Sequence, residues 1–154
     1  MFNGQSQTTY QDTVIENNGF WPDINAGDFE KRRGVPVDLD AASTAYSVAS
    51  AIAQINIELT SKQTAYQDAG YATANDVPGQ PKVGDKNLLV ILYEKAVFAR
   101  AKSELLPEYA TQQTKDAGEN VASSQADIRD QLLAESQQHI RAIKGDSRCG
   151  VALL

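Results

Sequence analysis

Three long segments of this 154-residue chain repeat apolar residues at the three- and four-residue spacing of an amphipathic helix, and no other feature constrains the fold as strongly. The first covers residues 39–66, the second begins after Asp85, and the third starts between 114 and 124 and ends at Gly145. The pattern predicts an all-α fold, in which three long antiparallel helices form a bundle over residues 39–145.

Each long helix should bury one apolar face. The expected core positions are Ala41, Ala45, Val48, Ile52, Ile55, Leu59 and Tyr66 in the first, Leu88, Leu89, Leu92, Ala96 and Ala99 in the second, and Val121, Ile128, Leu132, Ile140 and Ile143 in the third. Asp38 or Asp40 should cap the first helix. Asn56 lies beside its stripe and should hydrogen-bond between helices. Pro107 should stop or kink the second helix near Leu105, because proline has no amide hydrogen.

The most distinctive segment is FWPDINAGDFEKRRG, residues 20–34, which contains the single tryptophan. Pro22 favours an extended Trp21, Asn25 is a good N-cap, and Gly34 can supply a left-handed stop. These signals predict a helix of about two turns, which is too short to be stable alone and must dock. The predicted protein-contact residues of this docking motif are Phe20, Trp21, Pro22, Ile24 and Phe29. The surface they contact belongs either to the same chain or to an adjacent subunit.

Both ends of the chain and one internal loop are expected to lie outside the bundle, although residues 1–154 should form a single domain. Residues 1–19 form a polar arm with a short extended piece near Thr13–Ile15, and residues 149–154 an apolar, strand-like tail. The tail's predicted contact residues are Val151, Leu153 and Leu154. Extended ends without a partner in a helical chain favour an assembly. The long loop 70–84, rich in glycine and proline, should contact a partner or act as a gate.

The residues that usually carry chemistry are sparse, and the sequence predicts no catalytic, cofactor-binding or metal site. One histidine, His139, and one cysteine, Cys149, cannot build a typical soft-metal site or an internal disulfide. The basic triplet 31–33 is interpreted as a solvated helix end. A net charge of −6 argues against tight nucleic-acid binding, and neither a secretory signal nor a membrane span is expected.

In order along the chain, several segments resemble the head completion proteins, called protein L, of contractile-tailed phages and their prophages. The matching segments are NNGFWPDINAGDFEKRRGV at 17–35, AIAQINIELT at 51–60, YEKAVFARAKSELLPEY at 93–109 and GVALL at 150–154. The ordered set spans nearly the whole chain, and the Phe-Trp-Pro-Asp element is its most specific part. Pro107 and the composition of the 70–84 loop depart from the expected pattern.

This resemblance implies a structural role without a cofactor or a reaction. The family closes the filled capsid with a homo-oligomeric ring beneath the portal, dodecameric by resemblance, on which the next neck or tail-terminator protein assembles. The resemblance places the protein in the virion at the head–tail interface, after synthesis in the host cytoplasm. Packaged DNA would pass through the ring without specific binding, and an acidic subunit suits such a channel.

Two other classes of function remain as alternatives to the phage adaptor. A cytosolic helical regulatory module would bind a single protein partner at fixed stoichiometry. An enzyme would need converging acid and base groups in a pocket, and the sequence does not predict such a group.

Overall fold

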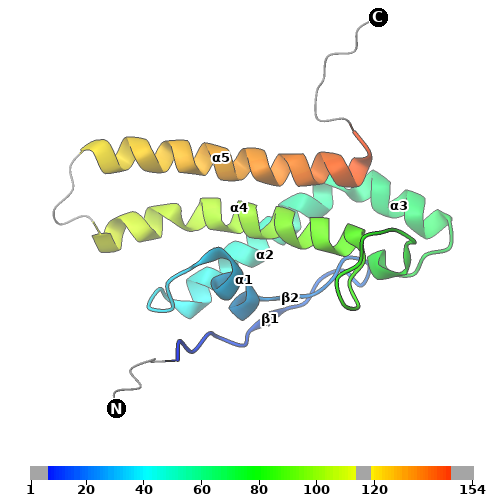
Figure 1. Cartoon of the computed structure of the whole chain (residues 1–154), viewed down its shortest axis with the longest axis horizontal. Coiled ribbons are helices and arrows are strands. Elements are labelled where there is room, and N and C mark those ends of the chain that lie inside the picture. The colour runs from blue at the N-terminus through cyan, green and yellow to red at the C-terminus, as the bar shows by residue number, and fades with distance from the viewer. Residues whose placement is uncertain (1–6, 114–118, 147–154) are drawn as a thin grey trace, which may run out of the picture.

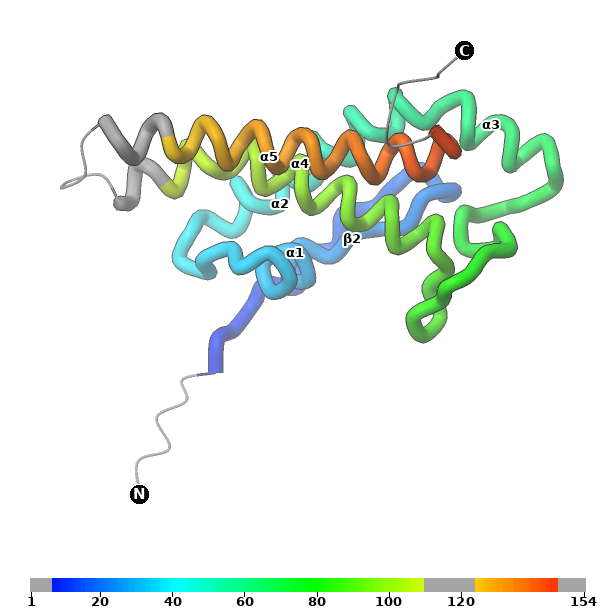
Figure 2. The backbone as a smooth tube through the Cα atoms, turned by 45° about the horizontal axis from the view of Figure 1, so that its top comes forward, coloured from blue at the N-terminus to red at the C-terminus, as the bar shows by residue number. Residues whose placement is uncertain are grey.

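The computed structural model describes residues 7–113 and 119–146 as a body of packed helices (Figure 1). The helices are α1 (Ala26–Arg33), α2 (Ala41–Glu58), α3 (Thr60–Asp68), α4 (Leu88–Gln113) and α5 (Glu119–Lys144), with one short 3-10 turn, η1 (Ala74–Asp76), and two strands, β1 (Val14–Ile15) and β2 (Ile24–Asn25). α5 runs back alongside α4, and α2 crosses behind α4 in both Figure 1 and Figure 2. The predicted bundle of long antiparallel helices is therefore present, although a small sheet accompanies it.

Helix α4 lies at the centre of the body, because it packs against α5, α2 and α1. Its buried side chains include Val90, Tyr93, Ala96, Val97, Phe98, Ala99 and Ala101. Ala96 and Ala99 are fully buried, as their small size and spacing predicted. The Ser136 hydroxyl of α5 donates to the Ala96 carbonyl over 2.9 Å, so the two helices approach each other closely at this position.

The first predicted helix is divided in two, which corrects the expectation of one continuous helix over residues 39–66. The backbone leaves helical geometry at Leu59, where φ is −99° and ψ is 8°. Leu59 is fully buried, whereas α3 beyond it contains no buried residue. The Thr60 hydroxyl donates to the carbonyls of Asn56 and Ile57, a local bond that competes with the regular helix pattern. The turn keeps Leu59 in the core and directs α3 outward (Figure 2).

Three further expectations for the long helices are corrected. Of the stop or kink expected at Pro107, the stop is absent: α4 continues to Gln113, because Leu105 and Leu106 are buried in the bundle and tertiary packing outweighs the intrinsic cost of proline. Ala41 is exposed at the start of α2, and Ile128 is 41% exposed near the described beginning of α5. The core stripes of α2 and of the described part of α5 are therefore shorter than the repeats in their sequences.

The N-terminal arm has a partner within the chain, which corrects the prediction that both extended ends lack one. Strand β1 pairs antiparallel with β2, and the Ala26 amide donates to the Thr13 carbonyl over 2.8 Å. The arm also lies against α1, where a Cβ added to Gly27 would be 1.9 Å from the Gln11 carbonyl oxygen. Glycine is therefore required at position 27 for the arm to lie this close.

The 70–84 loop is held in place by short polar contacts. The Asn87 side chain, 1% exposed, donates to the carbonyls of Ala74 and Val77 and accepts from the Val90 amide at the start of α4. The Ala74 amide donates to the Phe20 carbonyl over 2.9 Å. One asparagine thus ties the loop to the first turn of α4. The predicted contact of this loop with a partner remains a prediction.

Candidate functional site

The docking motif packs on its own chain through a set of stacked aromatic rings. Trp21 is 2% exposed, and its ring lies parallel to that of Tyr93 in α4, with 4.8 Å between the ring centroids. Phe20 meets Trp21 edge-on at 4.9 Å and stacks on Tyr66 of α3 at 6.3 Å. Offset and edge-to-face aromatic pairs stabilise a core beyond the area that they bury. The motif therefore joins the N-terminal segment to both α3 and α4.

The second half of the docking motif is equally enclosed. Ile24 and Phe29 are buried, Pro22 is half-buried, and Phe29 lies 5.6 Å from Phe98 of α4 between ring centroids. α1 begins and ends as predicted, because the Asn25 side chain accepts from the Gly27 amide at its N-terminus and Gly34 is left-handed with φ of 61°. Within one subunit, the side chains of the docking motif therefore pack against α3 and α4. Their part in contacts with another protein remains a prediction.

A closed ring of hydrogen bonds links the arm, α2 and α4 beside Trp21. The Tyr93 hydroxyl donates to Asn56 Oδ1 over 2.6 Å, Asn56 Nδ2 donates to Asn17 Oδ1 over 2.8 Å, and Asn17 Nδ2 donates to the Tyr93 hydroxyl over 2.8 Å. The predicted interhelical role of Asn56 is therefore confirmed. Burial raises the pKa of Tyr93, so its hydroxyl keeps its proton. The hydrogen-bonded side chains of Asn17, Asn56 and Tyr93 therefore join three segments of the fold and are not arranged for catalysis.

The basic end of α1 is not simply solvated, which corrects the interpretation of residues 31–33. Arg33 makes a two-pronged ion pair with Glu135 of α5, with both nitrogen–oxygen distances 3.0 Å. Arg32 pairs with Glu94 of α4, which also accepts from Lys86 Nζ over 2.7 Å. Burial raises the pKa of Glu135, but the hydrogen bond and charge of Arg33 outweigh it and hold the pKa below the ordinary value. These pairs fasten α1 to both α4 and α5.

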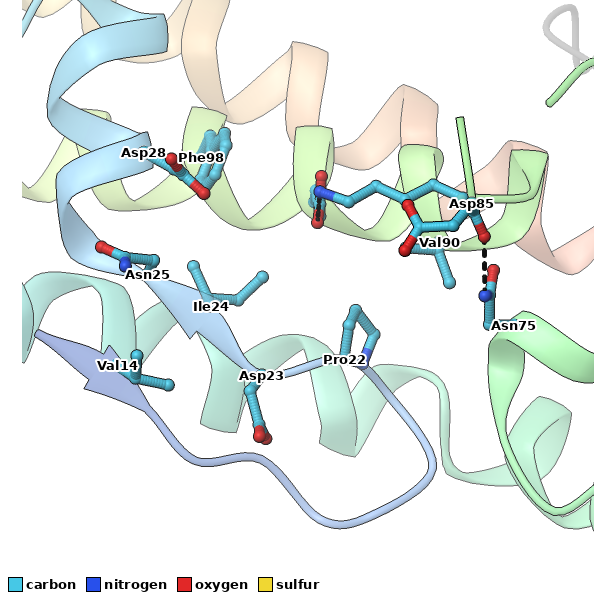
Figure 3. Close-up of a pocket in the computed structure, with 12 residues that line it drawn as sticks. Val14, Pro22, Asp23, Ile24, Asn25, Asp28, Asn75, Asp85, Val90 and Phe98 are labelled. Carbon is cyan, nitrogen blue, oxygen red and sulfur yellow. Dashed lines mark hydrogen bonds and ion pairs between the residues drawn. The ribbon is translucent and has the colours of Figure 1, made fainter. Parts of the chain in front are cut away.

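A cavity of about 350 Å³ lies beside β2 and the start of α4 (Figure 3). Two of its acidic side chains, Asp23 and Glu94, bond to groups of the chain itself. Asp23 accepts from the Asn17 amide over 2.7 Å, and Glu94 is engaged by Lys86 and Arg32. The dashed line at Asn75 in Figure 3 is a bond from its side chain to the Asp85 backbone carbonyl. Asp23 and Glu94 therefore help to hold the fold together.

Two exposed apolar features were missed at the sequence level. Tyr46 and Ile57 on α2 are 73% and 76% exposed, and Val83 near the C-terminal end of the 70–84 loop is 68% exposed. The sequence does contain a signal for the first of these surfaces, because residues 41–57 include no charged side chain. A solvated helix face normally alternates charges, whereas the centre of a protein interface is depleted of them.

His139, which was considered for a metal or catalytic site, contacts a carboxylate of its own helix. His139 lies 3.6 Å from Glu135 between Nε2 and Oε1, and burial followed by the charge of Lys95 lowers its pKa. In the described ranges, acidic, histidine and cysteine side chains form no cluster of three that could bind a metal ion. Nor does any helix there combine the length and the apolar character needed to cross a membrane. The predicted tail contacts Val151, Leu153 and Leu154 lie outside the described residues.

Comparison with known proteins supports the resemblance seen in the sequence. Residues 15–154 match the family described as phage head completion protein (GPL). The chain is 37% identical over 154 residues to the "Probable head completion/stabilization protein" of Haemophilus phage HP1, and the match covers 100% of both chains. It is 27% identical over 146 residues to the "Head completion/stabilization protein" of Escherichia phage P2, which covers 95% of this chain and 86% of that one. No solved structure matches significantly.

The match begins at Ile15, the second residue of β1, and includes the docking motif and every described helix. Proteins of this family are structural, non-enzymatic components of the phage virion. This agrees with the structural use of Arg32, Arg33 and Glu135, which form ion pairs between helices. The chain belongs to the phage head completion protein (GPL) family.

Proposed function

We propose that this protein forms a homo-oligomeric ring beneath the portal, closes the DNA-filled head, and provides the platform for the next neck or tail-terminator protein. The observation that carries the proposal is the end-to-end similarity to the HP1 protein, whose name refers to head completion and stabilization. Because that similarity covers the whole of both chains, the proposed role applies to the complete fold. Membership of a structural virion family also disfavours the regulatory module and the enzyme.

The described fold has properties that suit a ring subunit. Aromatic stacking, the Asn17–Asn56–Tyr93 bonds and the Arg33–Glu135 pair join the arm, α1, α2, α4 and α5 into one body. A subunit that must hold its shape under the pressure of packaged DNA benefits from such connections between distant segments. The exposed apolar side chains Tyr46, Ile57 and Val83 leave surface for contacts with other proteins.

The charge of the chain supports passage of DNA without specific binding. Its net charge is −6 at neutral pH. A ring of such subunits repels the phosphate backbone, so DNA can move through the opening without being retained by many phosphate contacts.

The apolar tail is proposed to attach the ring to the portal. Val151, Leu153 and Leu154 would pair, as an added strand, with an exposed strand edge of the portal or of the next subunit. Deletion of 150–154 should give a folded, soluble chain that no longer binds portal in a pull-down. A truncated chain that unfolds, or that binds portal as well as the full chain does, would contradict this part of the proposal.

The role itself can be tested in a phage that carries this gene. Removing the gene should yield DNA-filled heads that lose their DNA and acquire no tails, because the head is not closed and the platform is missing. Electron microscopy of lysates and nuclease sensitivity of the packaged DNA measure both effects, and the gene supplied in trans is the control. Normal, infectious particles without the protein would refute the proposal.

A further inference from the structure

Helix α2 carries a second apolar stripe on the side opposite to its core stripe. Tyr46, Ala53 and Ile57 lie within about 40° of one another around the helix, at 100° per residue. All three are exposed, whereas Val48 and Ile55 on the other side are fully buried. We call Tyr46, Ala53 and Ile57 the outer α2 face.

The charged residues that flank this face along the sequence are acidic. Asp38 and Asp40 lie exposed at its N-terminal end, and residues 34–61 contain no lysine or arginine. Glu58 at its C-terminal end is half-buried and pairs with Arg100 of α4. Seventeen consecutive residues without a charge on a solvent-exposed helix are typical of the centre of an interface.

A groove elsewhere on the molecule has the complementary character. It has a volume of about 480 Å³, and its apolar surface comes from Val83, Ile91 and Phe98. Four basic side chains line it, against two acidic ones, in a chain that is acidic overall. Among the basic residues, Lys95 is exposed and the Arg32 side chain is 51% exposed. We call this surface the Val83 groove.

The outer α2 face and the Val83 groove lie on opposite sides of α4. Tyr93 and Arg100 point from α4 towards α2, where they bond to Asn56 and Glu58. Ile91 and Phe98 line the groove on the other side of α4, since each is about 140–180° around the helix from Tyr93 and Arg100. The outer α2 face points away from α4, because the core stripe on the opposite side of α2 faces α4.

We propose that the outer α2 face of one copy of this chain docks into the Val83 groove of the next copy. Complementary surfaces on opposite sides of one subunit make a head-to-tail contact, which closes into a ring when the rotation between copies allows it. The apolar centres meet, and the acidic residues around α2 face the basic rim of the groove. This contact presupposes the proposed ring and specifies how its subunits join.

Two substitutions block the two sides of the contact separately. Tyr46→Glu alters only the outer α2 face, and Val83→Glu alters only the groove; both positions are exposed, so the variants should keep the helix content and melting temperature of the wild type. Each variant alone should associate at least about tenfold more weakly than the wild type. Ile128→Glu on α5, which removes another exposed apolar side chain, is the matched control and should associate like the wild type.

Mixing the two variants gives the decisive result. A Tyr46→Glu copy retains an intact Val83 groove, and a Val83→Glu copy retains an intact outer α2 face. One of each can therefore form a single contact between unaltered surfaces. Native mass spectrometry of the full chain, alone and with the portal of the same phage, should show heterodimers that do not grow into rings.

The possible outcomes separate the contact from the proposed ring. A wild type that forms rings, together with variants that also form them, overturns the head-to-tail contact and leaves the ring intact. Variants that lose association but give no heterodimer on mixing also overturn it, because α2 and the groove then bind other proteins or copies of themselves. A wild type that stays monomeric both alone and on its portal overturns the proposed ring and the contact with it.

Discussion

The docking motif and the outer face of α2 carry similar side chains in opposite environments. Trp21 and Phe29 are at most 2% exposed, whereas Tyr46 and Ile57 are more than 70% exposed. The first pair stabilises one subunit, and the second is available for contacts between subunits. The comparison teaches that aromatic content alone does not identify a binding surface, because the most distinctive aromatic residues of this chain serve its own core.

The largest expected effect comes from the buried side of this comparison. Trp21→Ala should lower the free energy of unfolding by about 3–5 kcal/mol, because it leaves a cavity beside Tyr93 and removes a stacked ring. Urea denaturation of the isolated subunit, followed by circular dichroism, measures the change. An unchanged midpoint would show that the motif does not stabilise the subunit.

A smaller effect is expected from the polar contacts of the same region. Tyr93→Phe should cost about 1–3 kcal/mol, because the amides of Asn17 and Asn56 lose a shared partner in a partly buried site. The matched control is Tyr46→Phe, which removes the same hydroxyl from the exposed face. If both variants unfold at the same urea concentration, the hydrogen-bonded ring contributes nothing to stability.

The ion pairs that join the helices should make stability depend on pH. Burial raises the pKa of Glu58, but its bonds to Arg100 and Gln137 outweigh this, so the pKa, like that of Glu135, is lowered in the folded state. Their contribution is present above the ordinary value of 4.5 and is lost as the pH falls below it.

Thermal melts between about pH 7 and pH 3 should therefore show a falling transition temperature. Glu135→Gln should flatten part of that fall, whereas Glu108→Gln, at an exposed position of α4, should leave the profile unchanged. A Glu135→Gln profile that is parallel to the wild type would contradict the pairing with Arg33.

The smallest effect on stability is expected from the exposed side of the comparison. Tyr46→Ala should change the free energy of unfolding by no more than about 0.5 kcal/mol, because the ring is 73% exposed. The same denaturation experiment checks this, with Trp21→Ala as the reference. A loss comparable to that of Trp21→Ala would mean that Tyr46 belongs to the core of the subunit.

Much of the fold follows from local rules in the sequence. The period of apolar residues located the long helices. Asn25 and Gly34 bound the short α1, Asp40 begins α2 and Gly145 follows α5, as capping rules predict. These signals depend on neighbours a few residues away, so they can be read without knowing the tertiary structure.

The errors arose where distant segments decide the outcome. Pro107 is tolerated because packing holds both sides of it, and Arg33 is paired with a glutamate 102 positions away. The sequence does not reveal a partner for the arm, because the partner strand β2 is only two residues long and lies inside the docking motif. Of the predicted contact residues, those in the motif turned inward, and the exposed face of α2 was marked only by its missing charges.

Helix α5 is the last element of the body to leave the ribosome, and this has a consequence for how the chain matures. Among the described residues of the main apolar cluster, α5 supplies only Ile140 and Ile143, while the docking motif, α2 and α4 supply most of the others. The earlier segments can therefore close around Trp21 and Tyr93 while α5 is still being translated. Until α5 arrives, the alanine-rich flank of α4 is open to water and to neighbouring nascent chains. Binding of α5, fastened by Ser136 and Glu135, ends that vulnerable interval and completes the subunit.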